Sequence, residues 1–208
     1  LLKIGVPIAL QDGFIQVSFM IITIIANRRG LTDAAAVGIV EKMIGFLFLV
    51  PSSMLSTVSA LGAQNIGAGK PERSKATLGC TSLIVILVEF LAEPMGGLFT
   101  PDDTVVLSGG QYLRGYIWDC FFAGVQFSFS GYFCAIGRSG LSFLHNTLSI
   151  LLVRIPGAYL ASRFFPATLL PMGLASAAGS LFSILVCLIA YGALLHGKRR
   201  GHGALSDR

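Results

Sequence analysis

Six long apolar segments restrict the fold of this chain more than any other feature of its sequence. We expect them to form helices over residues 4–26, 35–62, 76–99, 107–136, 141–162 and 170–195. A helix of about 20 residues crosses the hydrocarbon core of a bilayer, so each segment can span a membrane. Only 12% of the residues are charged, about half the share typical of soluble domains. The sequence therefore predicts an all-α, polytopic integral membrane protein with six spans, and it excludes a large soluble catalytic domain.

The basic residues are unevenly divided between the two ends of these spans. If the N terminus is cytoplasmic, nine lie inside, four lie outside, and Lys42 and Arg154 lie within spans. By the positive-inside rule, this predicts a multi-pass cell-membrane protein with both termini in the cytoplasm. We expect a transmembrane lobe over residues 1–197 and a basic cytoplasmic tail over 198–208. Nucleic acid is not an expected partner, because the bases are scattered over helix ends. The inside set is Lys3, Lys70, Arg73, Lys75, Arg138, Lys198, Arg199, Arg200 and Arg208, and the outside set is Arg28, Arg29, Arg114 and Arg163.

Prolines predict where the spans are interrupted. Pro51, Pro94 and Pro156 fall inside predicted helices, where each removes a backbone hydrogen bond and frees a carbonyl. Within a bilayer a free carbonyl is tolerated only against protein or a water-filled cavity. We therefore expect the second span to bend and face inward at Pro51.

The connection between the second and third spans, residues 62–73, predicts a tight elbow on the cytoplasmic side. Gly67 and Gly69 can take the left-handed conformation that ends a helix. Pro71 suits the first turn of the next helix. The segment lacks the first glycine and the Ser or Thr of a phosphate-binding P-loop, so we interpret it as structural.

Ionisable side chains at membrane depth are functional candidates, since each costs about 2.5 to 3.5 kcal/mol on insertion scales. Six lie well inside the predicted spans, and Glu93 lies near an outer edge: the six are Asp12, Glu41, Lys42, Glu89, Asp119 and Arg154. Asp119 lies about 18 Å from the outer end of its helix, at 1.5 Å per residue. Asp119, Glu89 and Asp12 are the predicted sites of cation or proton coupling. A buried protonated carboxyl remains equally open for Glu89, and Glu41, Lys42 and Arg154 are expected to neutralise one another.

Asp119 belongs to a polar face of its helix. Five residues precede or follow it in steps of three and four, which places them on the same side of the helix. They are Tyr112, Tyr116, Ala123, Gln126 and Ser130. This face predicts a cavity for a flat organic cation, with Asp119 binding either a proton or Na⁺. The alternative is that Asp119 hydrogen-bonds a neighbouring helix. The expected cavity residues are Gln11, Gln16, Tyr116, Phe122, Gln126 and Ser130.

Four short stretches of this sequence resemble the multidrug and toxic compound extrusion (MATE) transporters. They are Pro7-Ile-Ala-Leu-Gln11, the elbow GAQNIGAGKPER at residues 62–73, Cys134-Ala-Ile-Gly-Arg138 and Val153-Arg-Ile-Pro156. Their order and spacing resemble the second half of such a transporter, helices seven to twelve. The resemblance implies one of two pseudo-symmetric six-helix lobes, with the N-terminal lobe as its partner.

The resemblance also implies a secondary antiporter that exports cationic or amphipathic organic compounds in exchange for H⁺ or Na⁺. Members with a cation site in this lobe carry carboxylates on its first and fourth helices, where Asp12 and Asp119 lie here. No cofactor beyond the coupling ion is expected. No enzyme is expected either, since the spans hold no Ser-His, paired-Asp or HExxH arrangement. Two alternatives stay open: a noncatalytic or dimerising half-size membrane scaffold, and a flippase for lipid-linked precursors.

Overall fold

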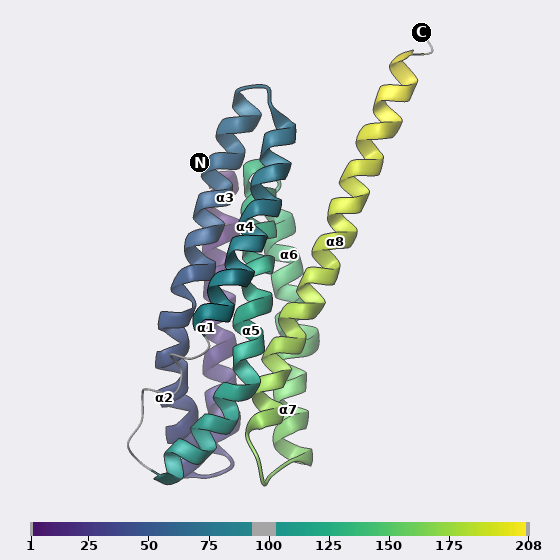
Figure 1. Cartoon of the computed structure of the whole chain (residues 1–208). Coiled ribbons are helices and arrows are strands. Elements are labelled where there is room, and N and C mark those ends of the chain that lie inside the picture. Colours follow the sequence, from purple (N-terminus) through teal and green to yellow (C-terminus); the bar gives the residue numbers. More distant parts are fainter. Residues whose placement is uncertain (1, 93–102, 207–208) are drawn as a thin grey trace.

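The computed structural model describes residues 2–92 and 103–206, and all regular structure in these ranges is helical (Figure 1). Only Phe48 separates α2 from α3, and the helices from Ser139 to Phe164 follow one another without a break, so the described residues form six helical rods. The predicted six-span, all-α membrane fold is confirmed. The elements are α1 (Leu2–Asn27), α2 (Leu31–Leu47), α3 (Leu49–Gly67), α4 (Pro71–Ala92), α5 (Asp103–Ala135), α6 (Ser139–Ser149), the π-helix η2 (Ile150–Arg154), α7 (Ile155–Phe164) and α8 (Leu170–Ser206).

Three described stretches are long and apolar enough to cross a bilayer by themselves: Ile4–Asn27, Leu31–Gly67 and Leu170–Leu195. Many of their exposed side chains are hydrophobic, and Leu185 and Ile189 of α8 are 52% and 73% exposed. Exposed leucine and isoleucine along a helix are the pattern expected where lipid replaces water as the solvent.

Helix α5 is the centre of the bundle. It packs against α2, α3, α4, α6 and α8, and its residues Tyr112, Tyr116 and Cys120 are fully buried in the main hydrophobic core. The other helices surround α5 as a ring. Each contacts the next in the order α4, α3, α2, α1, α6–α7 and α8. Because α4 and α8 form no extended contact in the described residues, this ring of helices is open between them.

Glycines set the closest approaches to α5. A Cβ at Gly131 would lie 2.6 Å from the carbonyl oxygen of Leu55 on α3, and a Cβ at Gly115 would lie 2.5 Å from that of Leu170 on α8. Here the backbones of neighbouring helices touch, which is how small residues hold membrane helices together.

Pro51 and Pro156 interrupt their spans as predicted. α2 ends at Leu47, four residues before the buried Pro51, and the span continues in α3. Pro156 follows the π-helix η2, in which the wider turn accommodates the missing N–H of the proline. Pro94 lies outside the described residues, as does the end of the third predicted span.

The elbow between α3 and α4 is confirmed, with one correction. Gly69 has a φ of 71°, and the amide of Lys70 donates to the carbonyl of Asn65 at 2.8 Å. Pro71 then begins α4. Gly67 is the last residue of α3 and is helical rather than left-handed, because a single residue with positive φ is sufficient to turn the chain.

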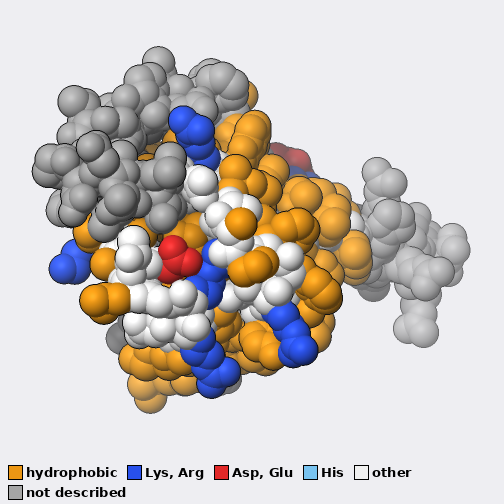
Figure 2. Space-filling model, turned by 90° about the horizontal axis from the view of Figure 1, so that it is seen from below, with side chains coloured by type: hydrophobic (Ala, Val, Ile, Leu, Met, Phe, Trp, Pro, Cys, Tyr) orange, Lys and Arg blue, Asp and Glu red, His pale blue; other side chains and the backbone are white. Residues whose placement is uncertain are grey.

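The opposite end of the bundle is held by Arg29, in the connection between α1 and α2. Its Nε donates to Asp33 at 2.8 Å, and its Nη2 donates to the carbonyl of Pro166 at 2.7 Å. Figure 2 shows this end, where one acidic and several basic side chains lie among hydrophobic side chains and the white atoms of backbone and other residues. The α1–α2 connection is thereby tied to the α7–α8 connection.

Helix α8 is longer than predicted. It continues from Leu170 to Ser206 and so includes most of the segment 198–208 that we expected to be a separate tail. Figure 1 shows this helix diverging from the bundle toward its C-terminal end. The cytoplasmic location of both termini stays a prediction.

Candidate functional site

A groove of about 690 Å³ lies on the face formed by α1, α2, the start of α3 and the middle of α5. Its polar lining comes from Asp12 and Gln16 of α1, from Glu41 and Lys42 of α2 and from Ser52 of α3. The bend at Phe48 places the first turn of α3 at one side of the groove. Three phenyl rings, those of Phe19, Phe48 and Phe127, complete its lining.

The groove combines negative charge with aromatic surface. Its two carboxylates and one ammonium group give it a net formal charge of −1. The hydroxyl of Thr23 on α1 donates to the Glu41 carboxylate at 2.8 Å and so fixes its position across the α1–α2 contact. Asp12 is solvent-exposed in the isolated lobe. A cationic or amphipathic molecule suits such a surface, because aromatic faces attract cations and the carboxylates neutralise them.

Asp119 does not belong to this groove. It is 0% exposed, and Arg154 of η2 donates from Nη2 to its Oδ2 at 2.8 Å. The hydroxyl of Ser180 on α8 donates to its other oxygen, and Arg154 also donates to the hydroxyl of Tyr116. The result is a buried ion pair between α5, η2 and α8.

The π-helix explains how Arg154 reaches this position. Arg154 is the last residue of η2, and the extra residue in a π turn rotates the side chains that follow it relative to a regular helix. Gly179 of α8 lets η2 approach, since a Cβ there would lie 3.3 Å from that of Arg154. Ser149 closes the contact by donating to the carbonyl of Gly179. We expected Glu41, Lys42 and Arg154 to neutralise one another, but the carboxylate that is hydrogen-bonded to Arg154 is that of Asp119.

The ring of Phe19 lies between the ion pair and the groove. Phe19 lines the groove, and the guanidinium carbon of Arg154 lies 5.2 Å from the centre of the same ring. The Arg154 guanidinium also lies 5.7 Å from the ring of Tyr116. Such contacts between a cation and a ring face stabilise a desolvated charge. The Phe19 ring thus lies between the acids of the groove and the buried pair of Asp119 and Arg154.

A second polar cluster lies deeper in the lobe, around His145 of α6. Its Nδ1 lies 2.6 Å from the hydroxyl of Ser183 and its Nε2 lies 3.1 Å from that of Ser130. One turn away, Gln126 of α5 donates to Asn146 at 2.9 Å. The polar core of the lobe therefore extends well beyond Asp119.

Sequence reasoning missed the contribution of α8 and of His145. Ser176, Ser180 and Ser183 repeat at spacings of four and three, and all three are buried. That period is the signal that could have identified a polar face on α8, because serines on one face of a span indicate contact with polar groups of neighbouring helices.

The structure distributes the predicted site residues over three environments. Asp12 and Gln16 line the groove, whereas Phe122 is half-buried beside Phe121. The side chain of Glu89 lies outside the described part of the chain. Buried within the lobe are Gln11, Tyr116, Asp119, Gln126 and Ser130. The helical face that carries Asp119 is thus confirmed as one face, but it packs against neighbouring helices and does not line the groove.

The profile of the MatE family matches residues 7–160 of this chain. The chain is 26% identical to "Probable multidrug resistance protein YpnP" of Bacillus subtilis over 199 residues, 92% of this chain and 44% of that protein. It is 32% identical to "Probable multidrug resistance protein NorM" of Aromatoleum aromaticum over 114 residues, 50% of this chain and 24% of that protein. It is 26% identical to "FAD transporter" of Shewanella oneidensis over 174 residues, 78% of this chain and 38% of that protein.

Among solved structures, the MATE transporter VcmN of Vibrio cholerae in its bent form superposes with a TM-score of 0.69. The superposition covers 94% of this chain and 46% of VcmN, at 17% sequence identity, and it shows that the two share a fold. This chain spans less than half the length of each of these proteins. The resemblance found in the sequence is confirmed.

Proposed function

Since this chain belongs to the MatE family, we propose that it forms one six-helix lobe of a secondary transporter that exports cationic or amphipathic organic compounds. The observation that carries this proposal is the groove, with two carboxylates and three phenyl rings on a single face. The carboxylates attract an organic cation and the rings bind its flat or apolar parts.

A second lobe would cover the groove and complete the cargo site. The chain matches less than half of its relatives' length, which agrees with a missing N-terminal lobe as the partner. Asp12 of α1 is exposed in this lobe alone. A carboxylate at membrane depth is costly unless it faces protein or water, so the partner lobe or a water-filled cavity would lie against it.

Coupling to H⁺ or Na⁺ would use the acids on both sides of Phe19. Asp12 and Glu41 meet cargo or ion directly in the groove. Asp119 is reached only when Phe19 moves, and an ion there competes with Arg154 for the carboxylate. Exchange of a cation for cargo would then follow from different affinities of the two conformations of the transporter.

An anionic cargo is the second candidate. Lys42 in the groove supplies a positive charge, and one relative is named as a transporter of FAD, a compound that carries phosphate groups. In this case Lys42 binds the cargo, and the acids of the groove act only on the coupling ion.

The test is export by cells that carry the complete transporter with Asp12→Asn. We expect the export rate of a fluorescent organic cation to fall about tenfold, the effect of losing one desolvated charge-assisted contact. The matched control is Glu72→Gln, which removes an exposed acid outside the groove and is expected to leave export unchanged.

Equal export by Asp12→Asn and by the unaltered protein, at equal expression, would contradict the role of the groove acids. A third variant, Lys42→Gln, separates the two cargo classes. It is expected to leave export of an organic cation intact, and a loss confined to an organic anion would favour the second candidate.

A further inference from the structure

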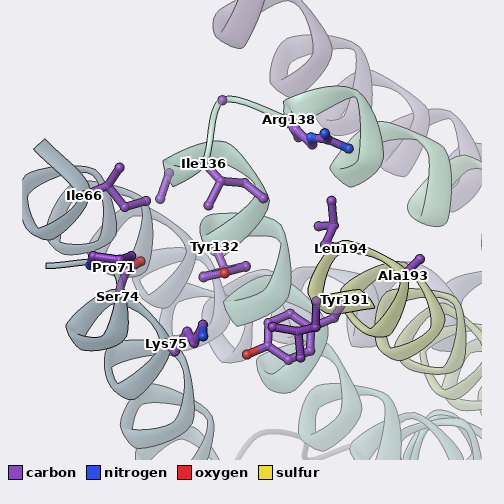
Figure 3. A pocket seen from close by; sticks show the side chains of 13 residues that line it. Ile66, Pro71, Ser74, Lys75, Tyr132, Ile136, Arg138, Tyr191, Ala193 and Leu194 are labelled. Carbon is purple, nitrogen blue, oxygen red and sulfur yellow. The ribbon is translucent and has the colours of Figure 1, made fainter. Parts of the chain in front are cut away.

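A second cavity, of about 840 Å³, lies at the end of the bundle that carries the α3–α4 elbow. It is enclosed by the elbow, the C-terminal end of α5 and the part of α8 near Leu194. Figure 3 shows Tyr132 and Tyr191 in its middle, with Lys75 beside them and Arg138 on the far side. The two tyrosine rings pack edge to face at 5.5 Å between their centres.

The charges around this cavity are almost all positive. Lys75 and Arg138 line it, and Lys70 and Arg73 lie on the adjoining elbow. The nearest acid in the sequence is Glu72, which accepts from Lys75 at 2.9 Å. No Asp or Glu occurs between residues 120 and 206, so no acid on α6, α7 or the described part of α8 offsets this charge.

Two polar side chains of the cavity lining make no hydrogen bond to the other described residues. The hydroxyl of Ser74 is buried and has no hydrogen-bond partner within the described residues. Arg138 is exposed, and only its backbone enters the hydrogen bonds of the described residues. A buried donor without a partner costs free energy, and an anion that accepts from it would remove that cost.

The remaining lining is apolar. Ile66, Ile136, Leu194 and Leu195 contribute hydrophobic surface. The cavity lies at the gap between α4 and α8, where the ring of helices around α5 is not closed. The groove for the partner lobe is on the α1–α2 face, across α5 from this gap.

We propose that this cavity binds an anionic phospholipid, with its phosphate between Arg138, Lys75 and the Ser74 hydroxyl and an acyl chain in the gap between α4 and α8. The apolar span of α8 ends at Leu195, which places the cavity at the level where headgroups meet water. Tyrosines are enriched at that level, and basic side chains there attract anionic lipids. The inference uses the membrane placement of the proposed function, but neither its cargo nor its coupling ion.

Native mass spectrometry of the complete transporter in detergent tests this site. The probes are phosphatidylglycerol and phosphatidylcholine with identical acyl chains. We expect Arg138→Gln to weaken binding of phosphatidylglycerol about fivefold, the effect of one basic residue at an anionic surface, and to leave phosphatidylcholine unchanged. The matched control is Arg163→Gln, which removes an exposed arginine at the opposite end and is expected to have no effect.

Ala193→Trp tests the acyl chain separately, because Ala193 lines the cavity and is exposed. The larger side chain is expected to exclude both lipids without changing any charge. Equal effects of Arg138→Gln and Arg163→Gln, or lipid binding unchanged by Ala193→Trp, would overturn the proposal. Displacement of the lipid by excess inorganic phosphate would also overturn it, since the cavity would then recognise phosphate alone. Lipid binding is measured without cargo or ion gradient, so its failure is distinct from failure of the transport proposal.

Discussion

The buried pair of Asp119 and Arg154 allows a prediction whose size follows from the structure. In Asp119→Asn the remaining oxygen can still accept from Ser180, but the new amide group replaces the oxygen that accepts from Arg154 at 2.8 Å. Two donors then face each other, and the charge of Arg154 is left buried and uncompensated. Breaking a buried pair in this way costs about 3 to 5 kcal/mol.

Arg154→Gln should destabilise the lobe by a similar amount, since it leaves the Asp119 carboxylate without its cation. The double variant Asp119→Asn with Arg154→Gln removes both charges and lets two neutral amide groups pair. We expect it to be more stable than the sum of the single effects implies, by about 1 to 3 kcal/mol. The measurement is denaturant unfolding of the purified complete transporter in mixed micelles, analysed as a double-mutant cycle.

The exposed pair of Glu72 and Lys75 provides the matched control. Its atoms are also within hydrogen-bond distance, at 2.9 Å, but the Glu72 side chain is 81% exposed. A cycle on this pair should give a coupling energy of about 0 to 1 kcal/mol. If the two cycles gave equal coupling energies, or if Asp119→Asn caused no loss of stability, burial of the ion pair would be refuted.

Two further predictions concern glycines. Gly131→Ala should destabilise the lobe by about 1 to 3 kcal/mol, because the added Cβ would lie 2.9 Å from that of Val58. Gly79→Ala should not destabilise it, since a Cβ there meets nothing within 4 Å. Equal unfolding midpoints of the two variants would contradict the close packing of α3 and α5. Gly69→Ala should cost about 1 kcal/mol, because Gly69 has a φ of 71° and a Cβ disfavours that conformation. Gly67→Ala is the comparison, because Gly67 is helical and a Cβ there meets open space. A smaller loss of unfolding free energy for Gly69→Ala than for Gly67→Ala would contradict the left-handed conformation of Gly69 in the elbow.

Features that depend on local chain chemistry could be predicted from the sequence. Pro51 and Pro156 identified the two interrupted spans, and Gly69 with Pro71 identified the elbow. A missing N–H or a missing Cβ acts on the residue's own backbone. Such effects do not depend on which helix lies nearby.

The candidate site could be predicted only in part. The spacing of three and four residues placed Tyr116, Asp119 and Gln126 on one face of α5, because the helical period alone fixes which side chains share a side. It could not show whether that face meets a groove or another helix. Asp12 and Gln16 line the groove, whereas the α5 face is buried.

The amino-acid sequence by itself determined the six membrane helices, their main interruptions and the acids held at membrane depth, since apolar length and backbone chemistry are properties of the chain alone. Only the tertiary structure decided that Asp119 is paired with Arg154 while Asp12 is exposed in a groove. The reason is that a partner across the bundle depends on helix packing and on the rotation that the π turn of η2 gives to Arg154. Coulombic attraction selects between partners only after packing has brought their side chains within reach.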